Sequence, residues 1–202
     1  MIGVLGGIAA GKSEVSRAFA GDGGIVIDAD DLAHEALQAA AVVAWVRDRI
    51  GAAAIVDGHV DRAAVAERVF GAPVLRRELE RLVHPLVGDS IRSQLDRARA
   101  QRVPRVALDV PLLLENDAEH QLVRECDVLV FVEADARVRA ERAARRRGWT
   151  PQQLSQREAT QLPLEQKRAR AEFVVVNDGD LDQLRAAAAR ALVQIEARRR
   201  GR

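Results

Sequence analysis

The feature that most constrains the fold of this chain is an eight-residue segment close to its first residue. Residues 6–13 read GGIAAGKS and match the pattern G-x-x-x-x-G-K-[ST]. An apolar run, residues 2–5, precedes the segment and predicts a buried strand, and residues 14–20 predict a helix. In that order, backbone N–H groups of the turn and of the helix N-terminus can surround a phosphate group. The segment therefore predicts a phosphate-binding loop, and we expect the chain to bind a nucleoside triphosphate.

The residues of this loop have distinct predicted roles. Its glycines let the backbone approach a phosphate closely, and Lys12 adds a positive charge beside it. Lysine is otherwise almost absent, since Lys12 and Lys167 are the only lysines among the 31 lysine and arginine residues. The Ser13 hydroxyl is placed to coordinate Mg²⁺. The predicted nucleotide-binding residues of the loop are Gly7, Ile8, Ala9, Ala10, Gly11, Lys12, Ser13 and Glu14.

Composition argues against several other classes of protein. The formal net charge is +1 and aromatic residues make up 3% of the 202 residues, which argues against a nucleic-acid-binding protein. A lone cysteine, Cys126, excludes a disulfide framework within the chain and is typical of a reducing compartment. The first strand begins at residue 2, which leaves no room for a signal peptide, and no apolar run reaches the roughly 20 residues that span a bilayer. We therefore expect a cytoplasmic protein that binds neither membranes nor nucleic acid.

Five short apolar runs predict strands that are covered on both faces. They are mostly continuous rather than alternating, and they cover residues 2–5, 24–27, 105–108, 127–132 and 173–176. Helix-like segments separate them, which is the pattern of an α/β fold with a mostly parallel sheet. The sequence thus predicts a five-stranded parallel sheet flanked by helices.

Polar residues follow each of these predicted strands. Asp28 and Asp30 follow the second run, Asp109 the third and Asn177 the fifth. Because open α/β sheets bind ligands at the carboxyl ends of their strands, these residues are expected at one edge. Asp109 is the candidate that supports Mg²⁺, since an acid that ends a strand is typical of this role beside a phosphate loop. A carboxylate can also take the proton of an acceptor hydroxyl, and the residues alone leave open whether Asp28 or Asp30 does so.

Two long segments interrupt the alternation of strands and helices. Residues 28–104 separate the second and third runs, more than one crossover connection needs, and they predict a helical subdomain over the site. Residues 135–167 form a second insertion, with two helix-like pieces interrupted at residues 148–151, where Thr150 is a predicted N-cap before Pro151. The predicted parts are a nucleotide-binding core of residues 1–33, 102–134 and 168–202, a helical substrate-binding insertion of residues 34–101, and a lid of residues 135–167.

Arginines in the predicted lid are candidates for charge stabilisation. Arg139, Arg142 and Arg146 share one face at helical spacing. Guanidinium groups can neutralise charge on a transferring phosphoryl group, and Arg142 is the best candidate of the three. In the first insertion, Pro85 is expected to kink or break its helix, which leaves His84 either aimed into the site or exposed.

The motifs, taken in order, resemble those of the dephospho-CoA kinase family. The loop resembles that family's GGIGSGKS, and residues 27–30, which read IDAD, match its I-D-A-D element. The His84-Pro85 pair and the segment DVPLLLE at residues 109–115 resemble two further elements. The lid signature is resembled by Glu141, Arg142, Arg146, Arg157 and the QLP of residues 161–163, and Asn177-Asp178-Gly179 stands in place of an N-x-G turn. Only the phosphate loop is a specific motif by itself. The resemblance, which extends over nearly the whole chain, therefore depends on the order and spacing of all the motifs together.

The resemblance implies a fold and a reaction. The fold would be a P-loop NTPase with a helical CoA-binding domain and a lid. The reaction would move the γ-phosphoryl group of MgATP to the ribose 3′-hydroxyl of dephospho-CoA, the last step of coenzyme A synthesis. Asp30 would be the general base, Lys12 and Arg142 would stabilise charge, and Ser13 with Asp109 would support Mg²⁺.

The resemblance also extends the set of expected binding residues. Asn177 and Gly179, with Arg142, would border the bound ATP, and the second substrate would meet Asp28, Asp30, His84, Pro111, Leu112 and Leu113. The chain departs from the family pattern at Ala9 and Ala10, which replace Gly and Ser, and at Glu14, which replaces Thr. The two alanines are tolerable in the loop if both have negative φ.

Other functions remain open on the residues alone. Another small-molecule kinase of the nucleoside or nucleotide type would share the loop, the acids and the lid, and would differ only in the first insertion. An inactive nucleotide-binding module would bind ATP without transferring phosphate. A regulatory GTPase is not indicated, because the segment NDGD at residues 177–180 lacks the lysine of an N-K-x-D element. The sequence allows a monomer or a small homo-oligomer.

Overall fold

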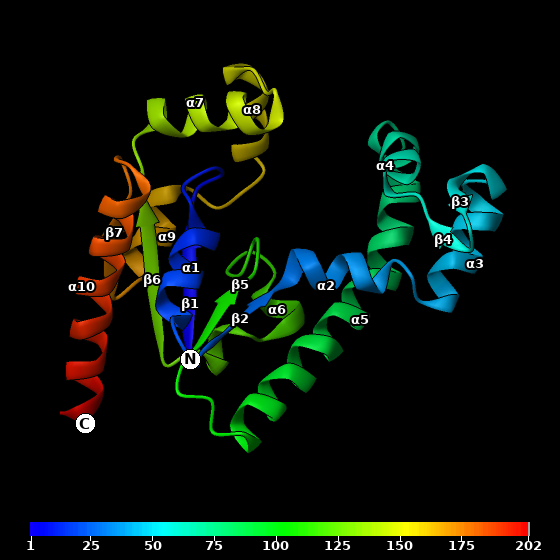
Figure 1. Cartoon of the computed structure of the whole chain (residues 1–202). Helices are drawn as coiled ribbons and strands as arrows, with labels where there is room; N and C mark the ends of the chain where they lie inside the picture. Colours follow the sequence, from blue (N-terminus) through cyan, green and yellow to red (C-terminus); the bar gives the residue numbers. More distant parts are fainter. Residues whose placement is uncertain (202) are drawn as a thin grey trace. The chain divides into compact units, whose positions relative to one another are not determined.

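The chain forms two compact units. The structure, a computed structural model, describes residues Met1–Gly201. One unit comprises Met1–Asp28 and Ala98–Arg202, and the other comprises Ala29–Arg97. Figure 1 labels their helices and strands.

The first unit contains a five-stranded sheet among the described residues, and every neighbouring pair in it is parallel. The central strand β1 (Ile2–Gly6) lies between β5 (Val106–Asp109) and β6 (Val128–Glu133), while β2 (Ile25–Asp28) and β7 (Phe173–Val176) are the two edges. The predicted parallel sheet is confirmed, and each strand begins and ends within one residue of its predicted bounds. The prediction succeeded because strands covered on both faces consist of continuous apolar runs.

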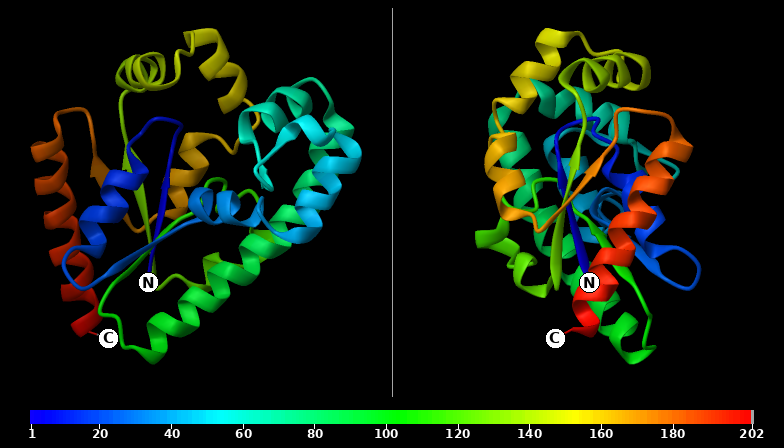
Figure 2. Two further views of the ribbon diagram at one scale, coloured as in Figure 1. Left: turned by 45° about the vertical axis from the view of Figure 1, so that its right-hand side comes forward. Right: turned by 90° about the vertical axis from the view of Figure 1, so that its left-hand side faces the viewer.

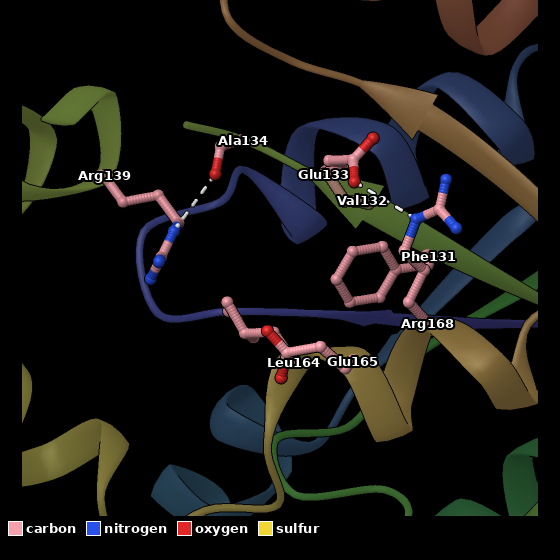
Figure 3. Close-up of a pocket in the computed structure, with 9 residues that line it drawn as sticks. Phe131, Val132, Glu133, Ala134, Arg139, Leu164, Glu165 and Arg168 are labelled. Carbon is pink, nitrogen blue, oxygen red and sulfur yellow. Dashed lines mark hydrogen bonds and ion pairs between the residues drawn. The ribbon is translucent and has the colours of Figure 1, made fainter. Parts of the chain in front are cut away.

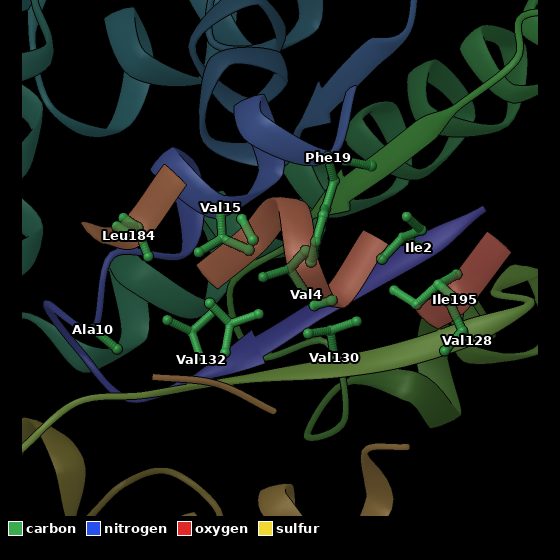
Figure 4. Close-up of a cluster of buried hydrophobic side chains, with 14 residues drawn as sticks. Ile2, Val4, Ala10, Val15, Phe19, Val128, Val130, Val132, Leu184 and Ile195 are labelled. Atoms are coloured by element: carbon green, nitrogen blue, oxygen red, sulfur yellow. The ribbon is translucent and has the colours of Figure 1, made fainter. Parts of the chain in front are cut away.

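Different helices cover the two faces of this sheet. The helices α1 (Lys12–Ala20) and α10 (Leu181–Arg200) pack on one face and against each other, and Phe19 of α1 is fully buried there (Figures 2 and 4). Side chains alternate along a strand, so Phe131 of β6 does not join that cluster and instead lines a cavity beside α9 (Leu164–Arg170). The phosphate loop therefore leaves a strand that is packed on both sides.

Shorter elements connect the last strands of the sheet. They are α6 (Asp117–His120), the 3₁₀ turn η2 (Val123–Glu125), α7 (Ala136–Arg147) and α8 (Pro151–Glu158). The predicted cap of α8 is confirmed: Thr150 Oγ1 accepts a hydrogen bond from Gln153 N at 3.2 Å, and Gln153 Oε1 accepts one from Thr150 N at 2.9 Å. This reciprocal pair satisfies two N–H groups at the helix start and fixes where α8 begins.

The second unit is mainly helical. Its elements are α2 (Ala29–Ala36), α3 (Ala40–Arg49), the 3₁₀ turn η1 (Ala52–Ala54), the hairpin strands β3 (Ile55–Val56) and β4 (His59–Val60), α4 (Arg62–Phe70) and α5 (Pro73–Ala100), which continues into the first unit. Val42, Val46 and Val65 are buried in its core. The hairpin was not predicted, because two-residue strands are too short to show an alternating pattern. Within Met1–Gly201, no helix is both long and apolar enough to cross a membrane.

Of the two expected effects of Pro85, a kink or a break in its helix, the break is wrong. The helix α5 runs without interruption through Pro85 for 28 residues. Proline removes one backbone donor, but the helix keeps its hydrogen bonds on either side. Val83 and Leu86 pack into the core of the second unit, and this packing stabilises the helix before and after the proline.

A buried ion pair joins α9 to the segment that follows β5. The Nζ of Lys167 lies 2.7 Å from Glu115 Oε1 and donates to Gln161 Oε1 at 2.9 Å. Glu115 Oε1 also accepts a hydrogen bond from Leu162 N at 3.1 Å. The exposed fractions of the two charged side chains are 5% and 13%, so water screens the pair little. The pair fixes the chain on the C-terminal side of α8 against the sheet.

Replacing one partner of this pair should destabilise the protein strongly. In Lys167→Met the carboxylate of Glu115 would remain buried without its cation, and we expect a loss of about 3–5 kcal/mol in the free energy of unfolding. Urea denaturation followed by circular dichroism measures the loss. The double variant Lys167→Met/Glu115→Leu should recover most of it, because an apolar pair needs no desolvated charge. A double variant no more stable than the single one would contradict this interpretation.

Candidate functional site

The phosphate loop leaves β1 and enters α1 through Gly11. Gly11 is the N-cap of α1 and has φ 95°, in the left-handed region that glycine adopts readily. The Nζ of Lys12 donates to the carbonyl oxygens of Gly6 at 3.4 Å and Gly7 at 3.1 Å. The lysine side chain therefore folds back over the start of the loop.

A buried amide fastens the loop to the turn that follows β7. Asn177 Nδ2 donates to the carbonyl oxygen of Ala10 at 2.7 Å, and the side chain of Asn177 is 4% exposed. A Cβ atom on Gly11 would lie 2.2 Å from Asn177 Nδ2, so glycine is required here by close approach as well as by its φ. The loop and the Asn177–Gly179 turn thus lie in direct contact, although they are far apart in the sequence.

Arg142 of α7 also contacts the Asn177–Gly179 turn. Its Nη1 donates to Asn177 O at 2.9 Å, and its Nη2 donates to Asn177 Oδ1 at 3.2 Å and to Gly179 O at 3.1 Å. Burial, and secondarily the charge of Arg146, lowers the pKa of the Arg142 guanidinium from its ordinary value. An arginine keeps its charge in spite of such a shift. Arg142 therefore presents a positive charge on the turn that the family resemblance predicts to border ATP.

The two acids that end β2 and β5 are neighbours. Asp28 and Asp109 are paired in the register of these parallel strands, so their side chains leave the same edge of the sheet. Asp109 is buried, with 4% of its surface exposed. A hydroxyl such as that of Ser13, together with one or two carboxylates, is the donor set with which Mg²⁺ binds phosphates in proteins. Ser13, Asp28 and Asp109 offer donors of this chemical type, and no three His, Cys, Asp or Glu side chains in the described part of the chain form a metal-binding group by themselves.

The loop departs from the sequence-based expectation at Ala9. Ala9 has φ 59°, in the left-handed region, whereas the expectation was a negative φ for both alanines. A Cβ atom in this region lies close to the following carbonyl oxygen, which costs roughly 1–2 kcal/mol. Ala10 is not among the positive-φ residues, and its methyl group is 1% exposed within the core of the first unit. The chain therefore holds strain at one position of its phosphate loop.

A second strained position lies in the segment after β5. Leu112 has φ 58°, a genuine outlier for a bulky residue. Its neighbour Leu113 is buried, whereas Pro111 is exposed. Backbone strain of this kind persists only where the surroundings impose it, and it is common at ligand-binding segments. The segment that holds Pro111, Leu112 and Leu113 leaves the sheet directly after Asp109.

Two predicted nucleotide-binding residues are partly exposed. Ile8 is half-buried, and the carboxylate of Glu14 lies 2.7 Å from Arg17 Nη1 on the surface of α1. The i,i+3 spacing on the helix brings these two charges together. Arg17 thus offsets the negative charge that Glu14 adds at the start of α1.

The remaining predicted site residues belong to the second unit. Asp30 is exposed in the first turn of α2, two residues after Asp28 at the end of β2. His84 is exposed on α5, next to Pro85. Their expected roles, general base for Asp30 and substrate binding for His84, stay predictions.

One cysteine is excluded from the chemistry. Burial raises the pKa of the Cys126 thiol to about 12. The reactive form of cysteine is the thiolate, so this side chain stays protonated and unreactive at neutral pH. Cys126 is a packing residue, and its Sγ lies 3.5 Å from Leu122 O.

A cavity of about 230 Å³ adjoins the phosphate loop and was not predicted. Its wall includes Gly7, Phe131, Glu133, Arg139, Leu164 and Arg168 (Figure 3). Arg139 is buried beside Gly7, and an ion pair joins it to Glu158 of α8. Only the helical spacing of Arg139 pointed to it in the sequence, because arginine is so frequent in this chain that no single one is distinctive.

Comparisons with known proteins give a consistent result. The sequence model of one family, described as dephospho-CoA kinase, matches residues 1–183. A dephospho-CoA kinase of Anaeromyxobacter dehalogenans is 38% identical over 201 residues, which cover 98% of this chain and 93% of that protein. The dephospho-CoA kinase of Latilactobacillus sakei is 36% identical over 186 residues, with coverage of 92% and 90%.

Solved structures agree with the fold. The crystal structure of the protein TT1252 from Thermus thermophilus is 33% identical and superposes with a TM-score of 0.73, covering 96% of both chains. A dephospho-CoA kinase from Campylobacter jejuni superposes with a TM-score of 0.69 at 20% identity, again over 96% of both chains. The second likeness is one of fold alone.

The strain at Ala9 predicts a stabilising substitution. Ala9→Gly removes the steric cost of the left-handed conformation, because glycine has no Cβ atom. It also adds backbone entropy to the unfolded chain, so we expect a net gain of about 0.5–1 kcal/mol in the free energy of unfolding. Urea denaturation of both proteins measures it. The matched control Ala10→Gly removes a buried methyl group and should lose stability instead. A loss of stability in Ala9→Gly would contradict the assignment of strain to this residue.

Proposed function

The chain belongs to the dephospho-CoA kinase family, which catalyses the final step of coenzyme A biosynthesis, and we propose that it transfers the γ-phosphoryl group of ATP to the ribose 3′-hydroxyl of dephospho-CoA. The observation that carries this proposal is the joint arrangement of the phosphate loop and the acids. Lys12 lies on the carbonyl groups that open the loop, and the paired Asp28 and Asp109 end the strands at the same edge of the sheet.

The phosphate loop and the Asn177–Gly179 turn would hold the nucleotide. Backbone N–H groups of the loop and the start of α1 favour a polyphosphate, and the Lys12 charge reaches its outer phosphates. The turn, fixed by Arg142 and by the bond from Asn177 to Ala10, would border the adenine. Arg142 also supplies positive charge at the nucleotide, which offsets the charge that develops during transfer.

Magnesium would be held by residues of the first unit. Ser13 supplies a hydroxyl and Asp109 a carboxylate, the oxygen ligands that this ion prefers. When bound, Mg²⁺ neutralises charge on the phosphates and keeps them oriented. The proximity of Asp28 to Asp109 in the sheet register gives this edge a second carboxylate for the substrate side.

The acceptor side of the reaction would use Asp30 and His84 of the second unit together with residues that follow β2 and β5 in the first. We assign Asp30 as the general base, which takes the proton of the 3′-hydroxyl while the hydroxyl oxygen attacks the γ-phosphorus and ADP leaves. Asp28, His84 and the strained segment of Pro111, Leu112 and Leu113 would bind dephospho-CoA. The same proposal divides the chain into three functional parts. Residues 34–101 bind this substrate, residues 135–167 act as a lid, and the remainder binds ATP.

The setting of the reaction completes the proposal. We place the enzyme in the cytoplasm, acting on small molecules as a monomer or a small homo-oligomer. A kinase of the nucleoside or nucleotide type is not favoured, because the family match spans residues 1–183 and thus includes the helical insertion that separates the two types.

The choice of acceptor is tested by a coupled assay of ADP release. Dephospho-CoA, adenosine, AMP and uridine are offered side by side with MgATP to the same preparation. We expect rapid turnover with dephospho-CoA alone and a product phosphorylated at the 3′-hydroxyl. Preferred turnover of AMP or uridine would replace the proposed function with a nucleotide or nucleoside kinase.

The assignment of the base predicts the behaviour of Asp30→Asn. Its amide cannot take the hydroxyl proton, so kcat should fall by about 10²-fold or more, while the KM for MgATP stays near the wild-type value. Steady-state kinetics with saturating dephospho-CoA measure both constants. The neighbouring Asp31→Asn is the matched control, since Asp31 is exposed in the same turn of α2, and its kcat should change little. An unchanged kcat in Asp30→Asn would remove this residue from the mechanism.

A further inference from the structure

Arg139 occupies an unusual position for a charged side chain on a helix. It lies in α7, three residues before Arg142, yet its side chain is only 7% exposed. Its Nη1 atom would lie 3.0 Å from a Cβ atom added to Gly7, and its Cδ 3.4 Å from the same point. The guanidinium therefore packs on the Cα side of Gly7, and both residues line the cavity beside the phosphate loop.

The position along the loop indicates which phosphate is nearest. The Nζ of Lys12 lies on the carbonyl of Gly7, and in loops of this type the lysine reaches the β- and γ-phosphates. The amides near Gly11 and the start of α1 serve the inner phosphates. A guanidinium that packs on Gly7 is therefore at the outer end of a bound polyphosphate. Arg142 is committed to the Asn177–Gly179 turn, so the two arginines serve different parts of the nucleotide.

The present partners of Arg139 can be exchanged. An ion pair joins it to Glu158, the last residue of α8, and its Nε donates to Ala134 O at 3.2 Å. A terminal phosphate carries more negative charge than a carboxylate and accepts two parallel bonds from a guanidinium. Arg139 also lines the cavity of about 230 Å³ beside the loop, which gives the guanidinium room to change rotamer without displacing the core.

From these contacts we propose that Arg139 binds the terminal phosphate of the nucleoside triphosphate, and that Glu158 holds its guanidinium until the phosphate replaces the carboxylate. The inference rests on the proposed use of ATP, and it adds a residue that distinguishes a triphosphate from a diphosphate. No covalent step is involved, because Arg139 contributes charge and two directed hydrogen bonds.

The test compares the affinities for two nucleotides, since only one of them has a terminal phosphate. Dissociation constants for MgADP and for Mg²⁺ with a non-hydrolysable ATP analogue are measured by calorimetry on the full chain. In Arg139→Gln the affinity for the analogue should fall about tenfold or more, while the affinity for MgADP changes less than about twofold. Equal losses for the two nucleotides, or no loss, would overturn the proposal, because a structural role in joining α7 to α8 does not distinguish them.

Two further variants separate contact from structure. Glu158→Gln removes the same ion pair but leaves the guanidinium, so the affinity for the analogue should stay equal or rise relative to MgADP. Arg137→Gln, on an exposed part of the same helix, should bind both nucleotides as the wild type does. If Glu158→Gln loses affinity for the analogue as Arg139→Gln does, then the pair acts only as a structural contact and the proposal is wrong.

The readout remains decisive if Arg139→Gln does not fold. In that case Arg139→Lys, which keeps a charge without the two parallel bonds, takes its place. A ratio of analogue to MgADP affinity below that of the wild type in Arg139→Lys, and one at or above it in Glu158→Gln, supports the contact. An unchanged ratio in Arg139→Lys overturns it. Since no acceptor is present, the result does not depend on whether dephospho-CoA is the acceptor.

Discussion

The hydrogen bond from Asn177 to the carbonyl of Ala10 is the contact on which the nucleotide site depends. It crosses 167 positions of sequence at 2.7 Å and is buried from water. Through it the phosphate loop, the turn after β7 and Arg142 of α7 become one rigid group, because Asn177 also accepts a hydrogen bond from Arg142. A buried amide that lost its partner would cost about 1–3 kcal/mol, so the arrangement resists local opening. The strain at Ala9 can persist because the residue after it is held in this way.

Charged side chains stabilise this molecule through a few specific ion pairs and hydrogen bonds, and not through their large number. Most arginines lie in solvent, where an ion pair contributes little. The charged side chains that contribute most to stability are the few that are buried. Lys167 holds Glu115 next to α9, and Arg139 holds Glu158 beside the loop. The only two lysines of the chain are used at the phosphate loop and in a buried pair, which are both sites where a compact ammonium group suits the space.

The fold was largely readable from the sequence, and the site only in part. Continuous apolar runs located the strands, and the phosphate-loop pattern located the turn between β1 and α1, because both signals are local. The β3–β4 hairpin was missed because its strands are too short to show a pattern, and the uninterrupted α5 was missed because its packing involves residues elsewhere in the second unit. The φ of Ala9 and the partners of Arg142 and Arg139 depend on contacts with distant segments. No pattern within one stretch of sequence contains that information.

The central claim is that the loop's amides and the Lys12 ammonium surround the phosphates of ATP. A crystal structure with Mg²⁺ and a non-hydrolysable ATP analogue tests it most directly. We expect Lys12 Nζ to leave the carbonyl oxygens of Gly6 and Gly7 and to contact the outer phosphates, with the inner phosphates against the amides at the start of α1. A structure in which the nucleotide binds elsewhere, while Lys12 still lies on those two carbonyls, would contradict the account.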